Sequence, residues 1–341
     1  MRIRPGRLLL AVGGLAAVLW LFEAPTPAEA PYERRHFALG TVVTLRLYPE
    51  AGAEADYDSL AGLASAEIDR IGGLMSGYEP SSQISRFNAS GPGPATAVDD
   101  DTRRVVERSL HWAERSRGAF DPTVGPLSRL WGFPEATAPP AASAIERALD
   151  RVGWNGALRA GPEGLRWERA GGALDLGAAA KGYAVDRAVE RLVEAGVACG
   201  LVEAGGDFRY WGRKPDGGDW TFGVKHPRQR GKLILVEDIG LTAVATSGDY
   251  EQFFDHDGRR YHHLLDPRTG YPARRAVSAT AWASSAMDAD ILATALFVMG
   301  PDSGLELVEA LPGVEALVFY QSGGELRHRA SSGLARRLRF D

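Results

Sequence analysis

Cysteine is almost absent from this sequence. Among its 341 residues only Cys199 is a cysteine, so no disulfide can form within the chain and no cluster of thiolates can bind a metal. Cys199 lies in the apolar run 197–202, a setting typical of a buried core thiol. The chain also lacks the GxSxG and HExxH patterns, which argues against a serine hydrolase of the nucleophile-elbow type and a zinc metalloprotease.

An excess of basic residues is missing as well. The formal net charge is -5 and no basic stripe stands out, so the charge pattern does not favour nucleic-acid binding. The proportions of apolar and charged residues are ordinary for a globular protein, and the length allows one elaborate domain or two.

A hydrophobic run long enough for a typical membrane span is also missing. The apolar run 8–22 falls short of the roughly 20 residues that a spanning helix needs. Three arginines precede this run and Ala28-Glu29-Ala30 follows it, which is the layout of a secretory signal peptide. The pattern predicts export.

The residue after the candidate cleavage point leaves a second interpretation open. Pro31 is unfavourable for a signal peptidase, so residues 1–30 are either a signal peptide or an uncleaved N-terminal anchor. No cysteine follows the apolar run, which excludes a lipid anchor there. We expect residues 31–341 to form the folded domain, in the periplasm or anchored to the outer face of the cytoplasmic membrane.

The stretch Leu174–Tyr183 carries the clearest local signal. It predicts a buried strand, a turn of small residues, one lysine (Lys181) and the start of a helix. Small residues let a ligand approach the backbone, a helix N-terminus favours anions, and a lysine suits phosphate. A tight strand-to-helix connection with a solvated lysine remains the alternative. The glycine spacing of a Walker loop is absent.

The remaining chain alternates between helical and strand-like patterns. Apolar residues at helical spacing predict helices over 56–74, 100–116, 184–193 and 287–297. β-Branched and alternating segments predict strands over 41–48, 201–207, 220–225 and 243–250. Proline and glycine predict a loop over 118–127 and a surface linker over 134–142.

An acid and a hydroxyl share one face of the last predicted helix. Asp290 and Thr294 are four residues apart, and both offer hard oxygen ligands of the kind that Mg²⁺ prefers. The alternative is that Asp288 is an acid of the first helical turn and that Thr294 belongs to the core.

Taken together, these segments resemble the ApbE family, the FAD:protein FMN transferases, from about Arg34 to the C-terminus. The matching pieces follow one another in the order of the family: 75–78 with 84–88, 118–133, 174–186, 205–207, 245–250, 263–270 and 287–300.

The resemblance implies an α+β fold of the T-fold-like ApbE type, with mixed sheets and packed helices. It implies a cleft that binds FAD as substrate together with Mg²⁺. The reaction would transfer FMN from FAD to a threonine or serine hydroxyl of an acceptor protein and release AMP. The acceptors would be exported flavoproteins of membrane electron-transport complexes.

The resemblance also assigns roles to individual residues by matching position. Asp290, Thr294 and the backbone carbonyl of Ala178 correspond to the Mg²⁺ ligands, Lys181 lies near the FAD phosphates and Asp175 near the flavin nucleotide. The other FAD-contacting positions are Leu39 (often methionine in the family), Tyr78, Ala119, Phe120, Asp121 and Leu264.

His263 is the candidate general base for the acceptor hydroxyl, because the pKa of a histidine lies near neutrality. If strand alternation holds, only one of His262 and His263 faces the cleft, and we interpret His262 as a residue at the surface or behind the site. Two other functions remain open. The same site could pass the phosphate of FAD to water, as a Mg²⁺-dependent FAD pyrophosphatase, or the chain could be a non-catalytic exported flavin-binding protein.

Overall fold

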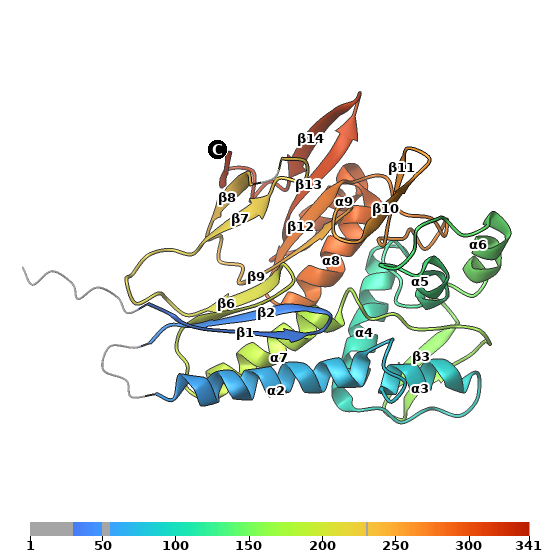
Figure 1. The fold of residues 1–341 in the computed structure, drawn as a ribbon, viewed down its shortest axis with the longest axis horizontal. Helices are drawn as coiled ribbons and strands as arrows, with labels where there is room; N and C mark the ends of the chain where they lie inside the picture. The colour runs from blue at the N-terminus through green and yellow to red at the C-terminus, as the bar shows by residue number, and fades with distance from the viewer. Residues whose placement is uncertain (1–29, 50–54, 230, 341) are drawn as a thin grey trace, which may run out of the picture.

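An eight-stranded sheet forms the centre of the protein (Figure 1). The computed structural model describes residues 30–49, 55–229 and 231–340. The strands of the sheet pair antiparallel in the order β1-β2-β5-β6-β9-β12-β13-β14. Their bounds are Tyr32–Ala38, Thr41–Leu47, Gly200–Ala204, Asp207–Trp211, Ala243–Gly248, Ser278–Ala283, Glu315–Ser322 and Glu325–Ala330.

Three smaller antiparallel sheets complete the strand structure. β7 (Thr221–Lys225), β8 (Leu233–Glu237) and β15 (Leu338–Phe340) form one of them. The other two are hairpins, made by β3 (Leu158–Gly161) with β4 (Gly164–Trp167) and by β10 (Phe253–His256) with β11 (Arg259–His262).

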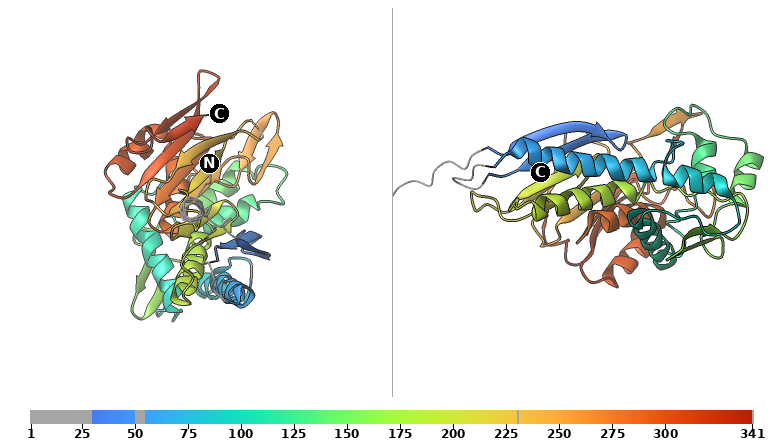
Figure 2. Two further views of the ribbon diagram at one scale, coloured as in Figure 1. Left: turned by 90° about the vertical axis from the view of Figure 1, so that its left-hand side faces the viewer. Right: turned by 90° about the horizontal axis from the view of Figure 1, so that it is seen from below.

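Long helices cover one face of the large sheet. Figure 2, seen from below, shows α2 and α7 running side by side along the β1–β2 hairpin, and α8 packs against β9 and β12. The helices are α2 (Tyr57–Met75), α3 (Gln83–Ser90), α4 (Asp100–Arg115), α5 (Gly125–Trp131), α6 (Ala142–Leu149), α7 (Ala180–Glu194), α8 (Ala286–Met299) and α9 (Pro301–Glu309).

Local sequence signals account for where two of these helices begin. The side chain of Asp56 accepts a hydrogen bond from Ser59 N at 3.1 Å and caps α2. Ser285 caps α8 in the same way through Asp288 N at 3.1 Å. α8 is apolar on nearly all sides, and it lies in the core because a helix of that kind cannot present a polar face to water. The four predicted helices and the four predicted strands are all present.

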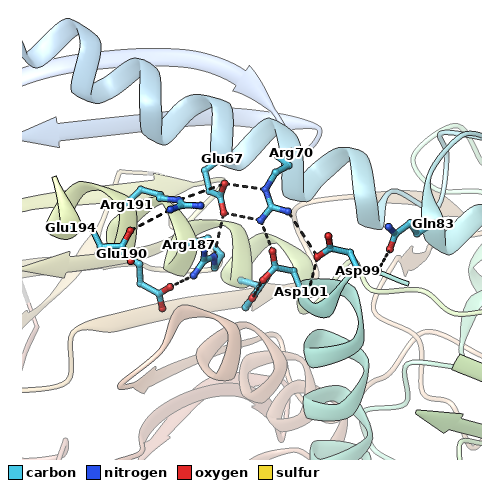
Figure 3. Close-up of polar contacts among 10 residues, drawn as sticks. Glu67, Arg70, Gln83, Asp99, Asp101, Arg187, Glu190, Arg191 and Glu194 are labelled. Carbon is cyan, nitrogen blue, oxygen red and sulfur yellow. Dashed lines mark hydrogen bonds and ion pairs between the residues drawn. The ribbon is translucent and has the colours of Figure 1, made fainter. Parts of the chain in front are cut away.

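A cluster of acids and arginines joins α2, α4 and α7 (Figure 3). Glu67 of α2 is 6% exposed and accepts hydrogen bonds from Arg70 at 2.8 and 3.0 Å and from Arg187 of α7 at 3.2 Å. Arg70 also bonds to Asp101 of α4, and Arg191 lies 3.8 Å from Glu67. We call these five residues the Glu67 cluster.

Stacked aromatic rings hold the β10–β11 hairpin against α5. The ring of Trp131 lies 5.7 Å from that of Tyr261 and 6.0 Å from that of Phe133. The indole N–H of Trp131 donates to the carbonyl of Gly270 at 2.8 Å. These contacts fix the position of the hairpin, which leads directly into His263.

Two expectations about local structure are wrong. Residues 174–176 are largely buried but form no strand, because their backbone bonds go to the side chain of Asn88 in α3 and to Pro122 rather than to a sheet. The predicted loop 118–127 ends inside α5, since Pro126 occupies the first turn of the helix, where a proline costs no hydrogen bond. Cys199 is buried and free, as predicted.

The predictions for the N-terminus lie outside the described residues. The signal peptide or anchor of residues 1–30 falls almost entirely on positions 1–29, and the domain boundary at 31 stays a prediction. Between residues 30 and 340, as far as they are described, no helix combines the length and apolar character of a membrane span.

Candidate active site

Lys181 shares its charge between two buried acids. Its ammonium group donates to Asp207 of β6 in a short contact and to Asp290 of α8 at 3.2 Å. Asp207 is 2% exposed and Asp290 is 4% exposed. We call Lys181, Asp207 and Asp290 the site cluster. Two carboxylates facing one ammonium leave one negative charge without a partner in a buried place, and such a place attracts a further cation.

Burial disfavours the negative charge of Asp290. Burial raises the pKa of this carboxyl to about 7, with the charge of Asp207 adding to the effect and Lys181 opposing it. The same two acids raise the pKa of Lys181 above its ordinary value although burial works against the charge of the ammonium. Additional positive charge beside Asp290 would therefore favour its ionised form.

The N-terminus of α7 contacts the carboxylate of Asp290. Gly182 N donates to Oδ2 of Asp290 at 3.2 Å, the same oxygen that Lys181 contacts. Within the described part of the chain both donors reach Oδ2, which leaves Oδ1 of Asp290 for another ligand. The helix end that the sequence marks for an anion thus contacts a carboxylate of α8.

Asp207 was not among the predicted site residues. The feature that could have revealed Asp207 is its position directly after the glycine pair 205–206, which follows a strand. A side chain there can face a ligand that approaches the backbone. Its partner Lys181 is 26 residues away in the chain, so local spacing could not reveal the pair.

Hard oxygen donors gather around Asp290. Thr294 lies one turn further along α8, and its hydroxyl is 3.1 Å from the hydroxyl of Ser247 at the end of β9. Ala178 lies three residues before Lys181 in the turn that precedes α7. No group of three or more His, Cys, Asp or Glu side chains suited to a metal occurs in the part of the chain that the structure describes. The donor set nevertheless fits Mg²⁺, which takes one or two carboxylates and completes its shell with other oxygens.

His263 lies close enough to the site cluster for the charge of Lys181 to affect its pKa. Burial lowers the pKa of His263 below its usual value, Lys181 lowers it further, and Gln252 and Asp175 oppose the shift. Its Nδ1 atom lies 3.3 Å from the carbonyl oxygen of Gln252, and its backbone N–H donates to the same oxygen. A carbonyl oxygen can only accept a hydrogen bond, so Nδ1 of His263 carries the proton that is donated to it. Nε2 is then the nitrogen that can accept a proton.

His262 is buried, which excludes the surface position for it and leaves the position behind the site. The side chain is 5% exposed, and Nε2 donates to the carbonyl of Ala273 at 2.9 Å. Burial lowers the pKa of His262 to about 4, so the ring is neutral near pH 7. His262 is the last residue of β11, whereas His263 follows the strand and lies near the charges of Lys181 and Asp175.

Asp175 influences both His263 and Tyr78 through its charge. The carboxylate of Asp175 lies near enough to act on the phenol of Tyr78 through its charge. Tyr78 follows α2 and is 90% exposed, so its ring is available to stack on a flat aromatic ligand. Asp175 accepts a hydrogen bond from Gly177 N at 2.9 Å, which shapes the turn around Ala178.

Asp121 borders a cavity of about 270 Å³. Gly118, Trp154, Asn155, Arg169 and Arg268 are among its lining residues. The carboxylate of Asp121 is buried and accepts from Thr123 and from Trp154 N, so it shapes the loop with both of its oxygens. Pro122 O accepts from Asp175 N at 2.8 Å, which joins this loop to the stretch that leads to Lys181.

The other predicted FAD-contacting residues are mostly covered. Ala119, Phe120 and Leu264 are buried, so their side chains belong to the core and a ligand could reach only their backbone. Leu39 sits in the β1–β2 turn with φ of 54° and packs close to Gly72 of α2. The structure brings Lys181, Asp290, Asp175, His263 and Tyr78 into one region, whereas no contact joins Leu39 to them in the described residues.

Comparisons with known proteins identify the family of the chain. The model of the ApbE family matches residues 39–318. The FAD:protein FMN transferase of Treponema pallidum is 35% identical over 90% of this chain and 89% of its own length. The protein of the same name from Vibrio cholerae is also 35% identical, over 89% of this chain and 92% of its own.

Solved structures extend the likeness to the fold. The ApbE protein of Thermotoga maritima superposes with a TM-score of 0.80 at 36% identity and covers 91% of this chain and 99% of its own. The flavin transferase ApbE from Vibrio cholerae gives a TM-score of 0.82 at 32% identity, over 91% and 100% of the two chains. The predicted α+β fold of the ApbE type is confirmed, and with a family match over most of its length the chain belongs to the ApbE family.

Proposed function

We propose that this protein is an enzyme that transfers FMN from FAD to a threonine or serine hydroxyl of an acceptor protein and releases AMP. The relatives named FAD:protein FMN transferase support the reaction. The observation that carries the proposal is the site cluster, in which two buried carboxylates share one lysine beside a threonine hydroxyl and a histidine of lowered pKa. A pure binding protein needs no such arrangement.

Mg²⁺ is the cofactor of the proposal. Asp290, Thr294 and the carbonyl of Ala178 would hold it, because they offer hard oxygen atoms next to an uncompensated negative charge. When bound, the ion would withdraw charge from the pyrophosphate oxygens of FAD.

The residues of the chain then bind, orient and move a proton. Lys181 offers positive charge to the phosphates, and the exposed ring of Tyr78 stacks on the isoalloxazine. Nε2 of His263 takes the proton of the acceptor hydroxyl, since its lowered pKa keeps the ring neutral near pH 7.

The bond changes balance. The acceptor oxygen forms a bond to the phosphorus on the FMN side of the pyrophosphate. The bond between this phosphorus and the bridging oxygen breaks, and the electron pair leaves with AMP. No oxidant or reductant is required.

The place and the partners of the reaction are part of the proposal. The signal-like pattern of residues 1–30 supports an exported enzyme, in the periplasm or anchored to the outer face of the cytoplasmic membrane, with residues 31–341 as the transferase domain. The acceptors would be exported flavoproteins of membrane electron-transport complexes.

The test is a transfer assay with the full chain. The protein is incubated with FAD, Mg²⁺ and an acceptor flavoprotein domain, and the acceptor is weighed by intact mass spectrometry. We expect a gain of one FMN less one water, lost on addition of EDTA and in the variant Asp290→Ala. Free FMN and AMP without a gain in mass would identify a pyrophosphatase, and intact bound FAD would identify a binding protein.

A further inference from the structure

Asp186 of α7 joins its own helix to two other elements, α8 and β6. Its carboxylate on α7 accepts hydrogen bonds from Ala286 N at 2.9 Å and Met287 N at 3.0 Å, the first two amides of α8. The guanidinium of Arg209 on β6 donates to it at 2.8 Å. Asp186 is 4% exposed. A buried carboxylate with three charge-assisted bonds is a strong and directional link between α7, α8 and β6.

The same three elements carry the site cluster. Asp186 follows Lys181 on α7, and Arg209 lies two residues after Asp207, on the same face of β6. Met287 lies three residues before Asp290 on α8. The carboxylate of Asp186 therefore joins α7, β6 and α8 about one helical turn away from the place where Lys181, Asp207 and Asp290 meet.

The contact between the two helices is close and leaves little room for adjustment. A Cβ atom at Gly182 would lie 2.2 Å from the carbonyl oxygen of Ala286. Gly182 lies one turn before Asp186, so glycine permits the approach and Asp186 fixes the direction and register of α8. In a contact this tight, a small shift of α8 moves Asp290 directly.

The first amides of α8 are all used within the protein. Ala286 and Met287 donate to Asp186, and Asp288 N donates to the hydroxyl of Ser285. The N-terminus of α8 thus has no free amide to offer a phosphate in its first three residues. The N-terminus of α8 is instead fixed in position by Asp186 and Ser285.

We propose that Asp186 is a positioning residue that sets α8 against α7 and β6 and thereby places Asp290 and Thr294 for metal binding. Asp186 itself touches neither metal nor substrate. The inference rests on the proposed function, because it assigns the metal site to Asp290 and Thr294. Partners behind the ligands of a metal site typically change its affinity by about 10- to 100-fold when they are replaced.

The experiment compares the full-length wild type with Asp186→Asn. Asparagine keeps the size but has a single acceptor oxygen, so it cannot serve both amides of α8 and Arg209. Mn²⁺ replaces Mg²⁺ as the probe, and free Mn²⁺ is measured by electron paramagnetic resonance. We expect the dissociation constant to rise by about tenfold, and the transfer rate to recover at saturating Mn²⁺. Misfolding would instead lower the number of sites.

The matched control is Glu67→Gln in the Glu67 cluster (Figure 3). Glu67 is also a buried acid that joins α7 to other elements through arginines, yet it contacts neither α8 nor β6 in the described residues. We expect its Mn²⁺ affinity to stay within about twofold of the wild type, as for an independent site. Equal weakening in both variants would overturn the inference, because loss of any buried acid would then suffice.

A second variant covers the case in which Asp186→Asn does not fold. Arg209→Gln removes the guanidinium at a half-buried position and leaves both bonds to α8 in place, so we expect weaker Mn²⁺ binding with a smaller change than for Asp186→Asn. Unchanged affinity in the folded variants would overturn the positioning role while the wild type still binds Mn²⁺. If the wild type bound no Mn²⁺, the metal site of the proposed function would be wrong, and the inference would fall with it.

Discussion

Two groups of charges meet at α7, and they are built in opposite ways. In the Glu67 cluster three arginines surround Glu67, and the hydrogen bond from Arg70 is the main cause that lowers the pKa of this acid. In the site cluster one lysine faces two acids, and burial raises the pKa of Asp290 to about 7. Both acids are almost equally buried. The balance of partners, rather than burial, distinguishes the Glu67 cluster from the proposed cation site.

The strongest test removes the acid that makes the site cluster unbalanced. Asp290→Ala leaves Lys181 paired with Asp207, like the matched charges around Glu67. We expect FMN transfer to fall by about 1000-fold, because the main metal ligand is lost. The free energy of unfolding should change by only about 1 kcal/mol, since an acid of raised pKa contributes little to stability at neutral pH.

The measurements are intact mass of the acceptor and urea denaturation. A variant that lost activity only together with several kcal/mol of stability would contradict the comparison, because Asp290 would then act mainly as a structural partner of Lys181.

The next largest effect concerns the histidine that senses the site cluster. His263→Ala should lower the rate of transfer by about 100-fold, as expected for loss of a general base. The wild-type rate should rise with pH as His263 loses its proton and level off above its pKa, which lies below the usual 6.5. The variant should lack this rise. Rates measured from pH 5 to 8, with FAD binding followed by flavin fluorescence as the control, decide whether His263 is the base.

Removal of the lysine should expose the repulsion between the two acids. Lys181→Met leaves Asp207 and Asp290 without a cation, and we expect a loss of about 3 kcal/mol of stability. Mg²⁺ should raise the melting temperature of the variant more than that of the wild type, because the ion then balances two charges. An equal rise in both proteins would show that the ion binds elsewhere.

The smallest effect belongs to the balanced group. Glu67→Gln keeps one acceptor oxygen for Arg70 but loses the charge that holds three arginines. We expect a loss of about 2 kcal/mol of stability with the activity per folded molecule within about twofold of the wild type. Thermal denaturation and the transfer assay measure the two quantities. A selective loss of activity would contradict the view that this cluster is structural.

Much of the fold was predictable from local patterns. The apolar spacing of α2, α4, α7 and α8 gave these helices within a few residues, because each buries one stripe or all of its surface. Residues 174–176 have the buried character of a strand, whereas their backbone hydrogen bonds go to the side chain of Asn88 in α3 and to Pro122. An apolar sequence pattern indicates that a segment is buried, but it does not indicate which residues its backbone will bond to.

The candidate site was predictable only in part, for the same reason. Lys181, Asp290 and Thr294 stand out in the sequence by their spacing and by their place in family motifs. Asp207 and Asp186 act through partners that are 26 and 100 residues away, and only the packed structure shows these pairs. Residues that hold a site by long-range contacts leave no local pattern.

The burial of α8 has a consequence for how the protein moves. Eleven of its 14 residues are buried, and they include Asp290. The amides of α8 should therefore exchange with solvent only in the largest opening events of the domain. In the proposed reaction a metal ligand thus lies on an element that opens rarely, whereas the ring of Tyr78, which is 90% exposed, needs no opening to meet the flavin.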